Sequence, residues 1–335
     1  MNAETHTAGA PTLNTVQSVN AALHDAMELD PNVIVLGEDV GDEQAGGIAG
    51  VTKGLSSRYG KGRVRSTPIS EQAIVGAAIG AAIVGMRPVA EVMLMNFTTV
   101  CMDMIVNHAA KLRFMSGGQT HVPLTIRTMT GAGFMTGGQH ADYLEAWFAH
   151  TAGLTVVAPS SPADAYGLML SCIFDDDPCI FIENMPTYWT AGPAPVRGAR
   201  IPLRQAHILR PGRDVTVIGY SRIVNDCNAV ADKLAGENIG VEIVDLRTVA
   251  PLDFETILDS VSRTRRAVVV HEAITPFGVG AEIAARLHKA LFGRLAAPVE
   301  RVGANYSPVP FSKPLETAYI PGQAQIEAAV RAALR

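Results

Sequence analysis

Strong positive charge and a long apolar run are both missing from this 335-residue chain. Its 27 basic residues are outnumbered by 32 acidic ones, so we expect no nucleic-acid partner. The first basic side chain is Lys53, so we expect neither the cationic start of a signal peptide nor an arginine-rich transit peptide. The longest uncharged stretch near a predicted helix, 73–86, contains three glycines and is shorter than the ~20 residues that cross a bilayer. The sequence therefore predicts a cytoplasmic protein with no membrane contact.

Cysteine and the common catalytic motifs are also scarce. The four cysteines have no CxxC spacing, which favours reduced thiols over disulfides or a zinc site. The sequence has no phosphate-binding GxxxxGK[ST] loop, no HExxH, no GxSxG and no EF-hand loop. The glycines at 131–133 and 278–280 match only part of a dinucleotide fingerprint, which argues against an NAD site.

Short apolar runs that alternate with helical patterns are what the sequence does contain. Hydrophobic residues make up 48% and charged residues 18% of the chain, which is typical of packed α/β proteins. The first group of runs predicts strands at 33–36, 88–94, 122–127, 155–158 and 179–183, with helices at 70–85, 97–115 and 163–174 between them. The second group predicts strands at 215–219, 241–244, 267–270 and 299–302, alternating with helices at 224–234, 254–261, 280–291 and 326–334.

This alternation predicts two doubly wound α/β domains, because a crossover helix is what parallel strand pairing requires. We assign a flexible tail to 1–14, a first domain to 15–190, a proline-rich linker to 191–213 and a second domain to 214–335. Ligands of such sheets bind beyond the carboxyl ends of the strands. The loops that follow Leu36, Leu94 and Arg127 are therefore expected at the active site.

Glu71 is the first candidate for chemistry. It follows Ser70 at the start of a predicted helix that is otherwise small and apolar. One interpretation is structural, since an acid in the first turn interacts favourably with the helix dipole and Ser70 can cap the helix. The other is catalytic, since burial raises the pKa of a carboxyl group and allows it to exchange a proton with a heterocycle nitrogen.

Three other groups have both a structural and a functional interpretation, and the structural one is favoured for all but His140. His140 ends a glycine-rich loop, a position that suits an acid or base as well as a surface residue. The acidic run 175–177 before Pro178 fits a cation site or an ordinary turn. Methionines and phenylalanine at 93–104 fit either core packing or a pocket wall.

Several motifs together resemble the E1 β subunits of 2-oxo acid dehydrogenase complexes. The resemblance covers about 15–334 and begins with VLGEDV at 35–40, TPISE at 67–71 and GMRPVAE at 85–91. It continues with MSGG at 115–118, GAG at 131–133, QH at 139–140, DLRT at 245–248 and PVPF at 308–311. Within the family, GVTKGL at 50–55, RTM at 127–129 and the end of the chain (319–321 and 326–331) look most like acetoin dehydrogenase β subunits.

The resemblance implies transketolase-like pyrimidine-binding and C-terminal domains in an α2β2 enzyme that uses thiamine diphosphate. The E1 α partner would hold magnesium and the diphosphate, which accounts for the absence here of a Gly-Asp-Gly motif with a downstream Asn. By position, Glu71 matches the acid that bonds the aminopyrimidine ring, while Ile69, Met93 and Phe97 match the apolar wall around it. The acyl fragment would pass to a lipoyl group on the E2 acyltransferase.

The resemblance also assigns roles to His140 and Asp142. His140 matches a histidine near the reacting carbonyl of the small-molecule substrate and the incoming lipoyl group. Family members usually continue with Ser-Gln, whereas Ala141 and Asp142 follow here. An ionised Asp142 that faces the site would disfavour an anionic 2-oxo acid and favour neutral acetoin, because like charges repel strongly in a dry site.

Relatives in this family carry a structural potassium ion. The matching positions, mostly through backbone carbonyls, are Leu124, Cys172, Ile173, Asp175 and Asp177. Two other functions stay open on the sequence alone: a thiamine-dependent carboligase or synthase, and a non-catalytic scaffold for an active partner.

Overall fold

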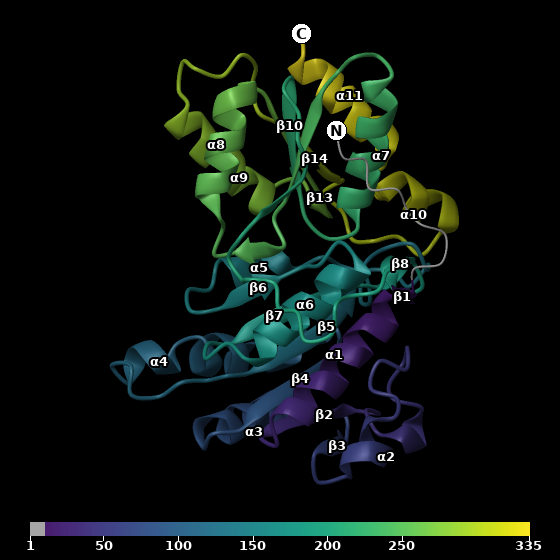
Figure 1. The fold of residues 1–335 in the computed structure, drawn as a ribbon, viewed down its shortest axis with the longest axis vertical. Helices are drawn as coiled ribbons and strands as arrows, with labels where there is room; N and C mark the ends of the chain where they lie inside the picture. The colour runs from purple at the N-terminus through teal and green to yellow at the C-terminus, as the bar shows by residue number, and fades with distance from the viewer. Residues whose placement is uncertain (1–10) are drawn as a thin grey trace.

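The computed structural model describes residues 11–335 as two α/β domains, each built on one sheet (Figure 1). Residues 1–10 of the predicted tail lie outside the described residues. Two parallel-stranded cores with helices on both faces agree with the predicted fold class.

The first sheet has seven strands in the order β12-β6-β7-β5-β4-β2-β3. Their bounds are β2 Val33–Glu38, β3 Val64–Thr67, β4 Arg87–Leu94, β5 Thr125–Thr130, β6 Thr155–Val157, β7 Cys179–Asn184 and β12 Thr248–Ala250. Alternate residues of β2 face opposite sides, so Val33 and Val35 pack with one set of helices and Ile34 and Leu36 with the other.

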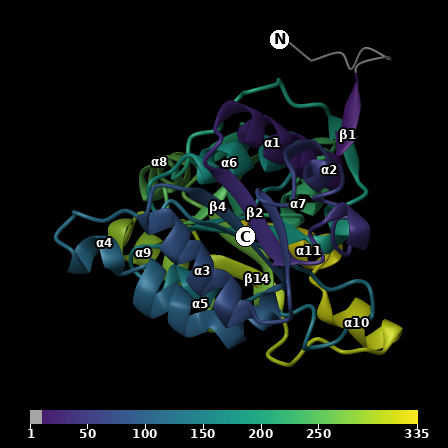
Figure 2. The same ribbon diagram turned by 90° about the horizontal axis from the view of Figure 1, so that it is seen from below.

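Helices α1 (Thr15–Leu29) and α6 (Pro162–Ile173) cover one face of this sheet, and α3 (Glu71–Ile83) and α5 (Glu145–Ala149) cover the other (Figure 2). The domain also contains two short helices, α2 (Leu55–Tyr59) and α4 (Leu112–Met115), and a pair of short strands, β1 (Thr12–Asn14) with β8 (Ala191–Pro193).

The second sheet has the strand order β14-β13-β10-β11-β9. These strands are β9 His207–Arg210, β10 Val215–Gly219, β11 Val241–Asp245, β13 Ala267–Ile274 and β14 Glu300–Ala304. Helices α7 (Ile223–Ala235) and α11 (Gln323–Ala333) pack on one face, and α8 (Phe254–Thr264) and α9 (Val279–Ala290) on the other. A further short helix, α10 (Lys313–Tyr319), follows β14.

The two domains share an apolar core. One continuous cluster includes Ile79 and Ile126 of the first domain with Ile218 and Val269 of the second. In addition, β12 leaves the second half of the chain to pair antiparallel with β6 at the edge of the first sheet. The domains are therefore joined by both packing and backbone hydrogen bonds.

The region predicted as one helix at 97–115 is instead broken. It forms a 3-10 segment at Met95–Cys101, a π-helical segment at Met104–Ala109 and the short α4. The Thr98 and Thr99 hydroxyls donate to the carbonyls of Met95 and Asn96, three residues earlier, at 2.6 and 2.8 Å. Such local bonds compete with regular α-helix, which accounts for the break.

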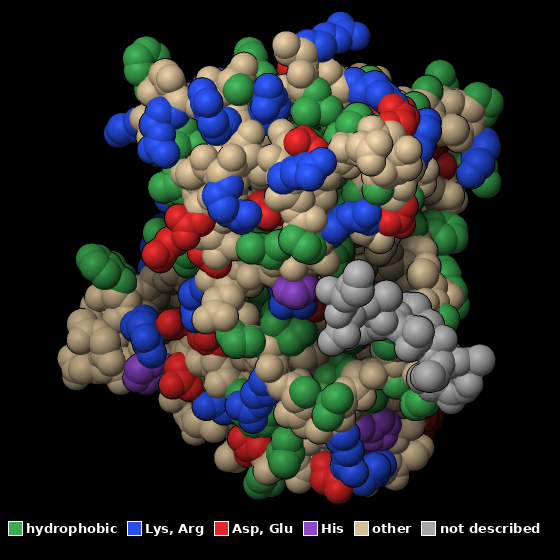
Figure 3. Space-filling model, turned by 45° about the horizontal axis from the view of Figure 1, so that its top comes forward, with side chains coloured by type: hydrophobic (Ala, Val, Ile, Leu, Met, Phe, Trp, Pro, Cys, Tyr) green, Lys and Arg blue, Asp and Glu red, His purple; other side chains and the backbone are tan. Residues whose placement is uncertain are grey.

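The surface carries both signs of charge. Figure 3 shows Lys and Arg side chains spread over the C-terminal domain among acidic and apolar ones. None of the helices in residues 11–335 is long and apolar enough to cross a membrane. In the same residues, no group of three or more His, Cys, Asp or Glu side chains is placed to hold a metal ion.

Candidate active site

Glu71 begins α3 at the carboxyl end of the first sheet, where a ligand of such a sheet binds. Its side chain is buried, with 9% of the residue exposed. Ser70 stands at the helix N-cap but makes no side-chain capping bond. The Ser70 side chain therefore does not cap the helix, whereas Glu71 does lie in the first turn, as the structural interpretation expects.

Glu38, at the end of β2, lies beside Glu71 and was not singled out from the sequence. Burial and the neighbouring Glu71 charge raise the pKa of Glu38, while a hydrogen bond from the Ser70 N–H lowers it. The Glu38 Oε1 atom has no hydrogen-bond partner among the described residues. A carboxylate at the carboxyl end of a parallel strand is a sequence signal that points to this residue.

Both Glu71 and His140 lie near the 3-10 segment Met95–Cys101. Cys101 is close to Glu71, because burial and the Glu71 charge raise the pKa of its thiol to about 12. The Phe97 ring contacts the His140 ring edge to face, with centroids 5.5 Å apart. This short segment therefore connects the two candidate residues.

His140 is partly buried, and its Nδ1 atom has no hydrogen-bond partner among the residues described. A buried ring nitrogen without a protein partner is costly unless a ligand or solvent satisfies it. The His140 ring is therefore suited to contact a bound molecule.

Asp142 follows on the same loop and is half-buried. Asn96 donates from Nδ2 to the Asp142 carboxylate at 3.0 Å and to the Gly138 carbonyl at 2.8 Å. Burial raises the pKa of Asp142, whereas the bonds from Asn96 and the Val309 N–H lower it. Sequence reasoning missed Asn96, whose position next to Phe97 was its only signal.

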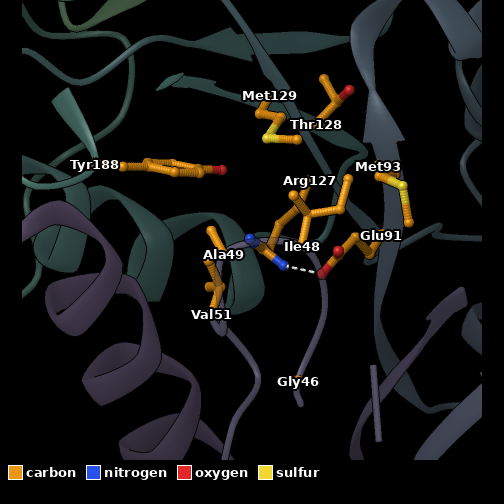
Figure 4. A pocket seen from close by; sticks show the side chains of 10 residues that line it. All are labelled: Gly46, Ile48, Ala49, Val51, Glu91, Met93, Arg127, Thr128, Met129 and Tyr188. Atoms are coloured by element: carbon orange, nitrogen blue, oxygen red, sulfur yellow. Dashed lines mark hydrogen bonds and ion pairs between the residues drawn. The ribbon is translucent and has the colours of Figure 1, made fainter. Parts of the chain in front are cut away.

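Met93 lies on β4 two residues after Glu91 and lines a small cavity (Figure 4). Arg127 and Glu91 also line this cavity. Arg127 donates to both oxygens of Glu183, at 2.7 and 3.0 Å, and also to Glu91. Arg127 is 3% exposed. These three charged side chains fix the strands that support Met93.

Ile69 is 83% exposed, in contrast to the other residues of the predicted apolar wall. Met93 and Phe97 are partly buried against the core. Of the three residues of the predicted wall, this chain therefore covers Met93 and Phe97 but leaves Ile69 uncovered.

The five predicted potassium positions come together around the end of α6. The Leu124 carbonyl accepts from Cys179 N at 2.8 Å, and the Cys172 carbonyl accepts from Asp175 N at 3.3 Å. The carbonyls of Ile173 and Asp175 accept from Arg87 Nη1 at 3.3 and 3.1 Å. The Asp177 carbonyl receives only a weak contact from the Cys179 thiol, at 3.7 Å.

Comparison with family models matches both halves of the chain. Residues 11–188 match the transketolase pyrimidine binding domain, and residues 204–326 match the transketolase C-terminal domain. A solved split-gene transketolase, described as an inactive β4 tetramer, has a TM-score of 0.77 over 96% of this chain and 98% of its own. At 20% identity, this likeness shows the fold alone.

Relatives with known names cover nearly the whole chain. The β subunit of acetoin:2,6-dichlorophenolindophenol oxidoreductase from Cupriavidus necator is 46% identical over 95% of this chain and 96% of its own. The Bacillus subtilis counterpart is 40% identical over 93% and 94%. The pyruvate dehydrogenase E1 component subunit beta of Rickettsia conorii is 42% identical over 94% and 97%. The chain therefore belongs to the transketolase-like family that contains the β subunits of acetoin oxidoreductases and of pyruvate dehydrogenase E1 components.

Proposed function

We propose that this chain is the β subunit of a thiamine-diphosphate-dependent E1 enzyme that cleaves acetoin, or decarboxylates a 2-oxo acid such as pyruvate. The acyl fragment is then transferred to a lipoyl group on an E2 acyltransferase. The observation that carries the proposal is a buried carboxylate, Glu71, at the carboxyl end of a sheet whose family model is a pyrimidine-binding domain.

The residues around Glu71 fit the aminopyrimidine end of this cofactor. Bound thiamine diphosphate supplies a carbon nucleophile for the substrate carbonyl. Glu71 holds a proton at a ring nitrogen, and its low exposure strengthens that bond because little water competes. Met93 and Phe97 supply the apolar wall, and the exposed Ile69 extends it toward the partner subunit.

His140 acts at the other end of the site. Its Nδ1 atom has no protein partner in the described chain, and Phe97 supports the ring. We assign to His140 the proton transfer at the substrate oxygen and the contact with the incoming lipoyl group.

The partner in this proposal is an E1 α subunit in a cytoplasmic α2β2 assembly. It would hold magnesium and the diphosphate, because this chain carries no Gly-Asp-Gly motif with a downstream Asn for them. The relatives are themselves named as β subunits, which supports such a partner.

Potassium is proposed as a structural ion at Leu124, Cys172, Ile173, Asp175 and Asp177. Backbone carbonyl oxygens are present there, and each carbonyl has a second lone pair beside the one that accepts its hydrogen bond. Oxygen donors of this kind suit a hard cation.

Asp142 is proposed to favour acetoin over an anionic 2-oxo acid. Asp142 follows His140 by two residues. Its carboxylate accepts a hydrogen bond from Asn96, which also donates to the Gly138 carbonyl of the same loop. A negative charge at this position repels the pyruvate carboxylate and leaves a neutral substrate unaffected.

The test is to co-express this chain with the α-like protein encoded nearest to it. Reduction of 2,6-dichlorophenolindophenol is measured with acetoin, pyruvate or branched 2-oxo acids, with and without thiamine diphosphate. Cofactor-dependent acetoin oxidation is the expected result. Activity with a 2-oxo acid alone would overturn the substrate assignment, and carbon–carbon bond formation without dye reduction would identify a carboligase.

A further inference from the structure

The loop 131–142, which carries His140, is held by a carboxylate from the other domain. Glu316 lies on α10 and is fully buried, with 0% exposure. Its Oε1 atom accepts hydrogen bonds from the backbone N–H groups of Gly133 at 2.8 Å and Met135 at 3.0 Å. Burial removes the water that would compete for these two N–H groups, which strengthens both bonds.

Met135 shows how firmly the loop is held. Its φ of 57° is in the left-handed region, which is unfavourable for a residue with a side chain. Such a conformation persists only where the surrounding structure fixes it. The Met135 N–H bond to Glu316 is one of the contacts that do so.

The segment that precedes α10 closes over the same loop. The Phe311 ring lies so close to Gly137 that a Cβ there would overlap a ring carbon. Pro308 would be 3.2 Å from a Cβ at Gly138. Val309 packs against Ala141 in one apolar cluster, so three successive parts of the loop are in contact with the C-terminal domain.

The first domain also holds the loop. Asn96 donates to the Gly138 carbonyl at 2.8 Å, and the neighbouring Phe97 contacts the His140 ring. His140 thus lies at a junction where its own domain supplies the ring contact and the other domain supplies the backbone support.

We propose that Glu316 is a positioning residue for catalysis, which holds the loop 131–142 so that His140 faces the substrate beside Phe97. The C-terminal domain is then part of the catalytic apparatus although none of its side chains takes part in the chemistry. The proposal rests on the proposed role of His140, and the experiment separates the two.

The test uses two substitutions of Glu316 in the co-expressed complex. Glu316→Gln keeps an oxygen where both N–H groups are bonded, and Glu316→Met removes it at similar side-chain length. We expect Glu316→Met to lower kcat by roughly tenfold to a hundredfold, with KM changed by less than about threefold, because misplacement of a reacting group costs rate rather than binding. Glu316→Gln is expected to recover most of kcat.

A double-mutant cycle with His140→Ala identifies the route of the effect. If Glu316 acts through His140, Glu316→Met lowers kcat by less than about twofold in the His140→Ala background. The proposal would be overturned if Glu316→Met lowered kcat as much in the His140→Ala background as in the wild type. It would also be overturned if Glu316→Met alone kept the wild-type kcat. A fully active His140→Ala enzyme would instead overturn the role of the histidine itself.

Hydrogen exchange gives a readout that does not depend on activity. In this chain, Glu316→Met is expected to speed amide exchange across 131–142, and Glu316→Gln is not. Glu242→Met is the matched control, since Glu242 is a buried acid of the same domain whose partner is Arg263. It should lower thermal stability without faster exchange in the loop, and equal loop exchange in both methionine variants would contradict the proposal.

Phe311→Ala is the second variant in case Glu316→Met fails to fold. Phe311 is 63% exposed, so its removal spares the core while it frees Gly137. As with Glu316→Met, the effect of Phe311→Ala on kcat is expected to disappear in the His140→Ala background. If the two substitutions instead lower kcat multiplicatively, the proposal is overturned.

Discussion

The two sides of the candidate site are supported in different ways. Glu71 is held by its own domain, at the start of α3 and beside Glu38 at the end of β2. His140 is on a loop whose backbone is bonded to Glu316, far along the chain in the other domain. The acid is therefore placed by local structure, whereas the histidine depends on how the two domains pack.

Replacement of Glu71 gives the largest effect on the first side of this comparison. Glu71→Gln in the complex is expected to lower the dye-reduction rate by roughly 10²- to 10⁴-fold, the usual contribution of a proton-transferring group. The melting temperature should stay unchanged, as it should for the control Glu43→Gln on an exposed ion pair with Lys61. Retention of full activity would favour the scaffold function.

Replacement of Arg127 tests whether the first domain owes its rigidity to buried charge. Arg127→Met leaves Glu91 and Glu183 buried without their cation, so we expect a loss of about 3–5 kcal/mol in the free energy of unfolding. Arg58→Met, which breaks an exposed pair with Glu28, should cost no more than ~1 kcal/mol. Urea unfolding measures both, and equal losses would contradict the expectation.

The interface between the domains should show its own pH dependence through Glu145. Burial raises the pKa of Glu145 from 4.5 to about 7, although the Tyr220 hydroxyl donates to its carboxylate at 2.7 Å. The folded chain therefore keeps a proton that the unfolded chain releases above about pH 4.5. Stability from this group is present below that pH and is lost as the pH rises through about 7, by up to about 3 kcal/mol.

Glu145→Gln isolates that contribution. Burial also raises the pKa of Asp245 to about 7 and lowers that of His271 to about 4, so the wild-type curve alone mixes several groups. The difference in unfolding free energy between wild type and Glu145→Gln should change across pH 4.5–7. A difference that is flat over this range would show that Glu145 titrates elsewhere.

The smallest expected effect concerns substrate choice on the His140 side. Asp142→Asn removes the charge at nearly constant size, and Asn96 can still bond the remaining oxygen. The ratio of kcat/KM for pyruvate to that for acetoin should rise about tenfold, or about 1.4 kcal/mol. Ser160→Ala, at a buried hydroxyl bonded to Asp245, is the control, and an unchanged ratio in Asp142→Asn would remove the charge argument.

The same local and non-local division explains what the sequence could predict. Periodicity predicted the long parallel strands, and the Ser-Glu pair before a small-residue stretch predicted the start of the helix that begins at Glu71. Periodicity missed the strand β12, which has three residues and pairs with a strand of the other domain. Periodicity also missed Glu316. Its helix, α10, is too short to show a periodic pattern, and the hydrogen bond that Glu316 accepts joins residues 183 positions apart in the chain.

The strand β12 has a consequence for synthesis of the chain. Until it emerges from the ribosome, the β6 edge of the first sheet has unpaired N–H and C=O groups, which are a template for pairing with other chains. At ~5–20 residues per second, the stretch between β6 and β12 takes several seconds to translate. The nascent chain is therefore open to aggregation during that interval, and a gene truncated at the linker would make the exposure permanent.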